Sequence, residues 1–246
     1  MTISPFLVAG AIGLGIAYAV TPIVVWVATQ LGVLDRPGGR HIHRAPVPRL
    51  GGVAIYVAFV AAVLVGLPVE RPIRVAFETH RITVVIPYVP AIDRPIVALL
   101  LGATLITLVG VLDDVRGTRP IVKLIGQVLA AAVLLPFGVG MDVLTNPLGG
   151  MVFVVGPLGA IVTVVWVVAL CNVMNLIDGV DGLASGIAAI AGTTLLVAAY
   201  HRGDVGTAIL AAALAGGALG FIPYNFNPAR IFLGDTGSML LGYLLG

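Results

Sequence analysis

The stretch "MVFVVGPLGAIVTVVWVVALCNVMNLIDGVDGLASG", residues 151–186, joins a long apolar run to a group of polar residues. The run Met151–Leu170 is long enough to cross the hydrocarbon core of a bilayer as a helix. Four polar residues follow at a spacing of three: Asn172, Asn175, Asp178 and Asp181. Three residues turn an α-helix by about 300°, so the first three of these side chains are expected to form a slanted polar edge beside the membrane.

The composition assigns the chain to the integral membrane proteins. Of its 246 residues, 59% are hydrophobic and only 10% are charged, and the mean hydropathy is +1.13. Soluble domains carry about 25% charged residues. The net charge of +2 is too small to indicate a nucleic-acid partner, and the single cysteine, Cys171, excludes an internal disulfide.

Apolar runs predict an all-α, polytopic transmembrane bundle of about eight spans, in a single domain over residues 1–246. The eighth begins near Ser238 and is cut short at Gly246, so we expect that the C-terminal part of the fold is missing. The β-branched segment "RITVVIPYV" between the second and third spans predicts a small hairpin on the extracytoplasmic surface. The predicted spans are Pro5–Leu31, Gly51–Leu67, Pro95–Leu112, Ile121–Val139, Met151–Leu170, Leu183–Tyr200, Val205–Tyr224 and the short last one.

The connections after the odd-numbered spans lie on one side by parity, and they hold most of the chain's charge. The positive-inside rule places this side in the cytoplasm. Its basic residues are Arg36, Arg40, Arg44, Arg49, Arg116, Arg119, Lys123 and Arg230. Its acidic residues are Asp35, Asp113, Asp114, Asp178, Asp181 and Asp235. Acids that separate segments bring to one membrane face predict a functional site there.

Such a face suits Mg²⁺ and a phosphorylated substrate, because Mg²⁺ prefers oxygen ligands and leaves positions for phosphate. Asp113 and Asp114 point about 100° apart on a helix, so we expect at most one of them to face a given metal directly. Lys123 shares a helix face with Gln127, as a site residue or as an anchor at the membrane edge. His43 lies in a basic loop without zinc-like ligand spacing, which indicates phosphate contact or a flexible loop.

The segment Gly234–Ser238, "GDTGS", precedes an apolar run and allows two interpretations. Free backbone N–H groups at the start of a helix can bind an anion. Alternatively, Asp235 or Thr236 caps its own helix. The sequence favours neither.

Three motifs together resemble the polyprenyl-phosphate N-acetylhexosamine-1-phosphate transferases, which move a sugar-1-phosphate from a UDP-sugar to a lipid phosphate. "LDDVRG" is similar to the Asp-Asp motif of that family, and "NVMNLIDGVDGLASG" to its Asn-x-x-Asn-x-x-Asp-Gly-x-Asp-Gly-Leu motif. "PARIFLGDTGS" is similar to its Phe-x-Gly-Asp-x-Gly-Ser motif. The first loop, "DRPGGRHIHRAPVPRLGG", resembles the branch that uses UDP-N-acetylglucosamine, although His41 stands where a lysine is common.

The resemblance implies a role for each matching residue. Asp178 would be the ligand of Mg²⁺, or of Mn²⁺ in its place, and Asp113 and Asp114 would be catalytic, close to the transferring phosphate. Whether an aspartate acts as nucleophile or as base stays open. Direct attack by the lipid phosphate is physically favoured, because a phosphate monoester is mostly ionised at pH 7. The implied substrate-binding residues are His43, Arg49, Lys123, Asn172, Asn175, Asp181, Asn225 and Asp235.

The implied function is transfer of N-acetylglucosamine-1-phosphate to undecaprenyl phosphate with release of UMP. This would be the first membrane step of cell-envelope polysaccharide synthesis, at the cytoplasmic face of a bacterial plasma membrane. The implied partners are the UDP-sugar, the polyprenyl phosphate and the bilayer; a homodimer stays open. The alternatives are a phospho-N-acetylmuramoyl-pentapeptide transferase, a cation-coupled transporter and a structural scaffold.

Overall fold

The computed structural model describes residues 4–35, 46–70, 73–77, 82–86, 94–145, 149 and 152–246. Helices make up most of this part of the chain. They are α1 (Pro5–Gln30), α2 (Gly51–Glu70), α3 (Arg94–Arg116), α4 (Pro120–Ala132), α5 (Gly159–Ile177), α6 (Leu183–His201), α7 (Val205–Asn225) and α8 (Gly234–Leu245). Two short 3₁₀ helices, η1 (Leu135–Phe137) and η2 (Gly156–Leu158), follow α4 and precede α5.

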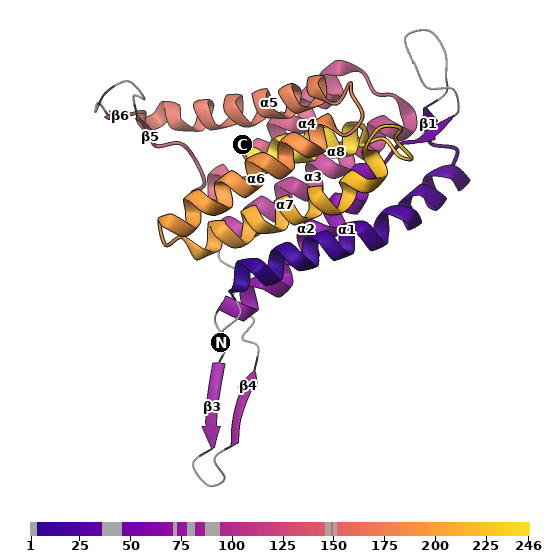
Figure 1. The fold of residues 1–246 in the computed structure, drawn as a ribbon. Helices are drawn as coiled ribbons and strands as arrows, with labels where there is room; N and C mark the ends of the chain where they lie inside the picture. Colours follow the sequence, from indigo (N-terminus) through magenta and orange to yellow (C-terminus); the bar gives the residue numbers. More distant parts are fainter. Residues whose placement is uncertain are drawn as a thin grey trace.

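Three small antiparallel hairpins complete the described fold. β1 (Leu34–Asp35) pairs with β2 (Val47–Pro48), and β3 (Ile73–Phe77) pairs with β4 (Ile82–Ile86). β5 (Val143–Thr145) pairs with β6 (Val152–Val154). The β3–β4 pair confirms the hairpin predicted between the second and third spans, and Figure 1 shows it projecting from the helical bundle.

The structure confirms an all-α membrane bundle and refines the number of spans. Six helical segments of the described chain are long and apolar enough to cross a bilayer: 5–30, 94–116, 120–137, 156–177, 183–201 and 205–225. The apolar part of α2, Gly51–Leu67, is shorter, and α8 has 12 residues. With α2, which has 20 residues, and α8, the described chain has eight helices in the order of the eight predicted spans.

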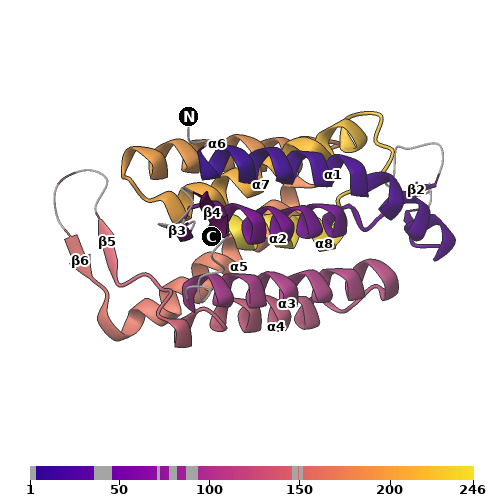
Figure 2. The same cartoon turned by 90° about the horizontal axis from the view of Figure 1, so that it is seen from below.

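The helices are arranged around α8. Figure 2 shows α1, α6 and α7 on one side of the bundle and α3 and α4 on the other. Helix α8 packs against α2, α3 and α5, and more lightly against α6. Its side chains from Asp235 to Tyr243 are buried, so the segment that follows the seventh span forms the centre of the bundle.

Glycines on the neighbouring helices let α8 occupy this position. A Cβ atom on Gly110 of α3 would lie 2.4 Å from Thr236 Cα, and one on Gly52 of α2 would lie 2.1 Å from Gly237 N. A Cβ on Gly242 of α8 itself would lie 2.5 Å from Cys171 Cα on α5. Between membrane helices such close backbone approach replaces the hydrophobic driving force, because lipid tails are as apolar as leucine.

The fifth and the eighth predicted spans begin at different residues in the structure. The fifth was predicted to be Met151–Leu170, but α5 begins at Gly159 and continues to Ile177. Val152–Val154 forms strand β6 instead, and Gly156 at φ +54° starts the turn that leads into the helix. The last helix begins at Gly234 rather than near Ser238. The described parts of the connections that follow α1, α3, α5 and α7 gather at one end of the bundle, next to β1, whereas β5 and β6 lie at the other end (Figure 1).

The contact between α1 and α7 provides a test of the packing. A Cβ on Gly216 of α7 would lie 2.2 Å from Gly10 O on α1. We expect Gly216→Ala to lower the free energy of unfolding by about 1–3 kcal/mol, because the two backbones must separate. Thermal unfolding in detergent measures the change. Gly15→Ala on α1 is the matched control, because its Cβ would have no neighbour within 4 Å, and it should be neutral or stabilising. Equal losses in both variants would contradict the close packing.

Candidate functional site

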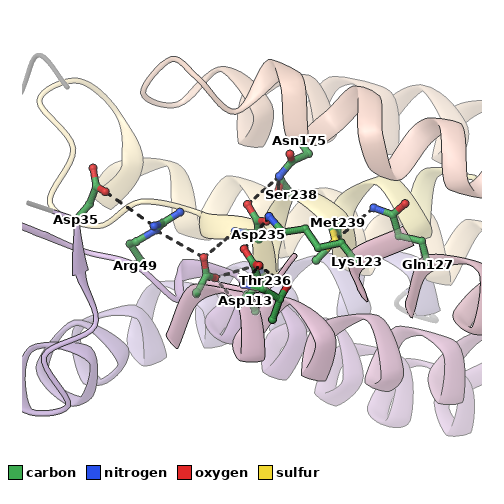
Figure 3. Close-up of polar contacts among 12 residues, drawn as sticks. Asp35, Arg49, Asp113, Lys123, Gln127, Asn175, Asp235, Thr236, Ser238 and Met239 are labelled. Carbon is green, nitrogen blue, oxygen red and sulfur yellow. Dashed lines mark hydrogen bonds and ion pairs between the residues drawn. The ribbon is translucent and has the colours of Figure 1, made fainter. Parts of the chain in front are cut away.

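Polar side chains from five segments converge at the N-terminal end of α8. Arg49 lies just before α2, Asp113 and Asp114 lie near the end of α3, and Lys123 lies in the first turn of α4. Asn175 lies near the end of α5, and Asp235 is the second residue of α8. Figure 3 shows Arg49, Asp113, Lys123, Asn175 and Asp235 close together. Because all the segments meet at one end of the bundle, the prediction that the polar connections share one face is confirmed for the described residues.

Lys123 joins two carboxylates from different helices. Its Nζ atom lies 2.7 Å from Asp113 Oδ2 and also pairs with Asp235 Oδ2. The side chains of Asp113 and Asp235 are only 8% and 12% exposed, against 28% for Lys123. A charge placed among apolar helices is costly unless it is paired. This cation therefore ties α3, α4 and α8 together, and it is more than an anchor at the membrane edge.

Asp113 also closes the turn between α3 and α4. Its Oδ1 atom accepts a hydrogen bond from the Thr118 N–H at 2.7 Å and another from the Thr118 hydroxyl. Gly117, at φ +64°, adopts the left-handed conformation that the turn needs. The carboxylate thus has one oxygen fixed by the turn and the other directed to Lys123.

Asp114 has a different environment from Asp113. Its side chain is fully buried. Its Oδ1 atom accepts from Asp235 N at 3.0 Å, and its Oδ2 atom accepts from Thr236 N at 3.0 Å and from the Thr236 hydroxyl at 2.6 Å. Arg49 Nε lies 3.6 Å from Oδ1. The first N–H groups of α8 thus bind an anionic group, the carboxylate of Asp114 on α3, whereas Leu233 and not Asp235 or Thr236 is the N-cap residue.

The two asparagines of the predicted polar edge face different helices. Asn175 Nδ2 donates to Asp235 Oδ1 at 2.9 Å and lies 3.0 Å from Ser238 Oγ, so it contacts α8. Asn172 Nδ2 donates to Gln127 Oε1 on α4 at 2.8 Å. Gln127 is buried and in turn lies 3.4 Å from Met239 Sδ. Only Asn175 of this pair bonds directly to the carboxylate cluster.

Asp181 and Asn225, both predicted to bind substrate, have partners within the protein. Asp181 Oδ2 accepts from Ala229 N at 3.1 Å and from Asn227 Nδ2 at 3.2 Å. Buried Asn225 donates to Ile231 O at 3.1 Å and accepts from the Ser185 hydroxyl at 2.9 Å. Both side chains hold the connection between α7 and α8 in place, and their contact with substrate stays a prediction.

Asp178 lies just beyond α5, half-buried, near the carboxylate cluster. Burial, together with the negative charges of Asp114 and Asp235, raises the pKa of Asp178 to about 8. From the residues that the structure describes, no hydrogen-bond donor reaches its carboxylate. A cation beside Asp178 would therefore favour its ionised form.

Three carboxylates lie close enough to share one metal ion. Oxygen atoms of Asp113, Asp114 and Asp235 lie within 4.8 Å of one another. Carboxylate oxygens fit a hard cation such as Mg²⁺. Asp178, the predicted ligand, is not among these three, so its role as a ligand stays a prediction. His43 lies outside the described residues.

Two partners of the site were not expected from the sequence. Thr118 follows Asp113 by five residues across a glycine, so a local turn signal was available in "DDVRGT". Ser185 lies 40 residues from Asn225, and no local pattern connects the two. Long-range pairs of this kind become visible only in the folded chain.

Removing the charge of Lys123 provides a test of the cluster. We expect Lys123→Met to lower the free energy of unfolding by about 3–5 kcal/mol, because Asp113 and Asp235 would be left as partly buried charges without a cation. Thermal unfolding in metal-free buffer measures the loss. The double variant Lys123→Met/Asp235→Asn should recover part of it, because one of the repelling charges is removed. A double variant less stable than Lys123→Met would contradict the pairing.

Comparison with known proteins places the chain in a family. Residues 96–246 match glycosyl transferase family 4. The chain is 36% identical over 225 residues to a "Probable undecaprenyl-phosphate N-acetylglucosaminyl 1-phosphate transferase" of Bacillus subtilis (strain 168), covering 91% of this chain and 56% of the relative. It is 35% identical over 241 residues to a "Decaprenyl-phosphate N-acetylglucosaminephosphotransferase" of Mycolicibacterium smegmatis, covering 94% of this chain and 56% of the relative.

A relative with a different name is also similar. The chain is 33% identical over 267 residues to a "Phospho-N-acetylmuramoyl-pentapeptide-transferase" of Desulforudis audaxviator, covering 97% of this chain and 73% of the relative. The chain thus spans about half the length of the first two relatives and about three quarters of the third. On the extent of these matches, the chain belongs to glycosyl transferase family 4.

Proposed function

We propose that this protein transfers N-acetylglucosamine-1-phosphate from UDP-N-acetylglucosamine to undecaprenyl phosphate, with release of UMP. The observation that carries the proposal is the group of three carboxylates, Asp113, Asp114 and Asp235, with Lys123 at one end of a membrane bundle. A site at this position is accessible to a soluble nucleotide and to a phosphate held at the bilayer surface. The names of the two relatives that act on N-acetylglucosamine support the same substrates.

In the proposed reaction, the protein neutralises the negative charge of the phosphates and forms no covalent bond to the substrate. In the proposed step, an oxygen of the lipid phosphate attacks the β-phosphorus of the UDP-sugar. The bond from that phosphorus to the bridging oxygen breaks, and UMP leaves with the bonding electrons. The lipid phosphate is mostly ionised at pH 7, so no protein nucleophile is required.

A divalent cation, Mg²⁺ or Mn²⁺, would neutralise the diphosphate and stabilise the charge that develops on UMP. The residues proposed to hold it are Asp113 and Asp235. Their oxygens lie within 4.8 Å of one another, and each carboxylate keeps acceptor capacity after its hydrogen bonds and ion pairs. Asp178 is the further candidate ligand, because its carboxylate lies near Asp114 and Asp235.

Lys123 is proposed to bind a phosphate oxygen of the substrate. An ammonium group has three N–H donors, and two of them are used by Asp113 and Asp235 in the described structure. The third can donate to the substrate. Its 28% exposed side chain makes it the more accessible member of each of its two ion pairs, which is consistent with contact to a bound ligand.

Localisation follows from the same proposal. The connections that carry the site also hold Arg49, Arg116, Arg119, Lys123 and Arg230, so the positive-inside rule places them in the cytoplasm of a bacterial cell. UDP-sugars are cytoplasmic, which agrees with this orientation. A cation-coupled transporter is less well supported, because its acids would lie near the middle of the membrane, whereas Asp113, Lys123 and Asp235 all lie at helix ends.

A transfer assay tests the proposal. The purified chain in lipid nanodiscs should release UMP from UDP-N-acetylglucosamine when undecaprenyl phosphate and Mg²⁺ are present. Asp113→Asn and Asp235→Asn should each lower kcat by about 100-fold or more, because each removes a negative charge proposed to hold the cation. Asp178→Asn should give a similar loss if Asp178 is a ligand.

The control for these variants is Asp204→Asn. Asp204 caps α7, where it accepts from Thr207 N at 3.0 Å, and asparagine caps a helix equally well. The control loses the same charge outside the site and should keep wild-type activity. UMP release only with the muramoyl-pentapeptide nucleotide would move the assignment to the other branch. No release with either nucleotide, or full activity in Asp235→Asn, would contradict the proposed site.

A further inference from the structure

The carboxylate of Asp114 has more hydrogen-bond and ion-pair partners than the carboxylates of Asp113 and Asp235. An ionised carboxylate offers about four lone-pair sites. On Asp114, Oδ1 faces Asp235 N and Arg49 Nε, and Oδ2 faces Thr236 N and the Thr236 hydroxyl. Three of these groups donate hydrogen bonds and Arg49 Nε forms an ion pair at 3.6 Å, so each oxygen of Asp114 already faces two partners. The side chain is also completely buried, so a metal ion or a substrate would have to displace a donor to reach it.

The two other carboxylates of the cluster have fewer partners. Asp113 accepts from Thr118 N, the Thr118 hydroxyl and Lys123, which leaves about one lone-pair site. Asp235 accepts from Asn175 and Lys123, which leaves about two. The capacity to bind a cation therefore lies with Asp235 and Asp113, although all three carboxylates lie within 4.8 Å of one another.

The donors to Asp114 show what it does instead. Asp235 N and Thr236 N are among the first N–H groups of α8, which have no partner within a helix. Leu233, at the N-cap position, makes no side-chain cap. Gly234 adopts φ +71°, and a Cβ there would lie 2.5 Å from Asp114 Oδ2. The negative carboxylate also faces the positive end of the helix dipole.

We propose that Asp114 is a positioning residue and not a metal ligand: it caps α8 from α3 and thereby holds Asp235 toward Lys123 and Asn175. The backbone of Asp235 is fixed by Asp114 Oδ1 at 3.0 Å. Its side chain can then reach Asn175 on α5 and Lys123 on α4. The two adjacent aspartates of α3 thus have separate tasks, since Asp113 faces the cation site and Asp114 orients the helix that supplies the second ligand.

The test compares Asp114→Asn with Asp178→Asn in metal-free buffer. Under this condition, substituting a residue that acts only as a metal ligand should have no effect. In Asp114→Asn, an NH₂ group replaces one acceptor oxygen and faces N–H donors. We expect the melting temperature to fall by about 5 °C or more. Hydrogen exchange of the Asp235 and Thr236 amides should become at least tenfold faster. Asp178→Asn makes the same chemical change, but among the described residues no donor contacts the Asp178 carboxylate. It should therefore leave the exchange rates of these two amides unchanged.

Binding of Mn²⁺, followed by electron paramagnetic resonance, separates positioning from ligation. Asp114→Asn should raise the Mn²⁺ dissociation constant about tenfold through displacement of Asp235, whereas Asp235→Asn should raise it further. The inference is overturned if Asp114→Asn keeps wild-type metal-free stability and amide protection but no longer binds Mn²⁺. That result would make Asp114 a ligand.

A second variant keeps the test decisive if Asp114→Asn does not fold. Thr236→Val removes only the hydroxyl donor to Asp114 Oδ2. It should accelerate exchange of the same two amides and lower the metal-free melting temperature; wild-type values for both would overturn the inference. The effect on Mn²⁺ rests on the proposed function, but the cap does not. A chain that binds no Mn²⁺ yet shows the expected exchange pattern would refute the proposed metal site and support the cap.

Discussion

The ion pairs of Lys123 with Asp113 and Asp235 are the interaction on which the site depends. Without Lys123, these two carboxylates would repel each other and the nearby carboxylate of Asp114, because apolar helices screen charges poorly. The six charged groups that these ion pairs connect, Asp35, Asp113, Asp114, Asp235, Lys123 and Arg49, sum to a formal net charge of −2. Two cations therefore leave the cluster negative, a balance that suits a divalent cation bringing a phosphate with it. The same pairs hold α3, α4 and α8 at one position.

The position of α8 explains why this cluster can exist. Helix α8 lies at the centre of the bundle. It fits there because Gly52, Gly110 and Gly242 have no side chain, and a Cβ atom at any of them would clash with the neighbouring backbone. A larger residue at Gly110 would displace Thr236, and with it the N–H groups that Asp114 accepts. Close packing in the membrane and the geometry of the polar site are thus two results of the same contacts. A change in one glycine alters both.

Much of this arrangement follows from the sequence, and the remainder has physical reasons for being missed. Hydropathy identifies the helices, and parity places Asp113, Asp178 and Asp235 on one face, because both depend only on spacing along the chain. The start of α5 was wrong because an apolar β-strand and an apolar helix have the same hydropathy. The Gly156–Pro157 pair was the available signal for the break.

Side-chain partners were the least predictable part of the site. A helical spacing of three put Asn172 and Asn175 near one edge, yet one bonds to α4 and the other to α8. The difference depends on which helices flank α5, and spacing within α5 does not contain that information. Asp114 and Thr236 are 122 residues apart, so the cap between them required the fold.

The polar motifs contain two kinds of residue: those that hold α8 and its preceding connection in place, and those that form the charged cluster. A loss of activity on mutation does not distinguish the two kinds. Asp181, Asn225 and Asp114 satisfy backbone or side-chain groups of the α7–α8 connection and of α8 itself. Asp113, Asp235 and Lys123 pair with one another and keep donor or acceptor capacity beyond these pairs. Under the proposed function, substituting a member of either group lowers turnover, since the first group positions the second. Exchange of the Asp235 and Thr236 amides without metal or substrate separates Asp114 from the second group, because Asp114 is the carboxylate that accepts from both N–H groups. All three carboxylates lie within 4.8 Å of one another, so their distances do not distinguish the proposed ligands Asp113 and Asp235 from Asp114, whereas their hydrogen-bond partners do.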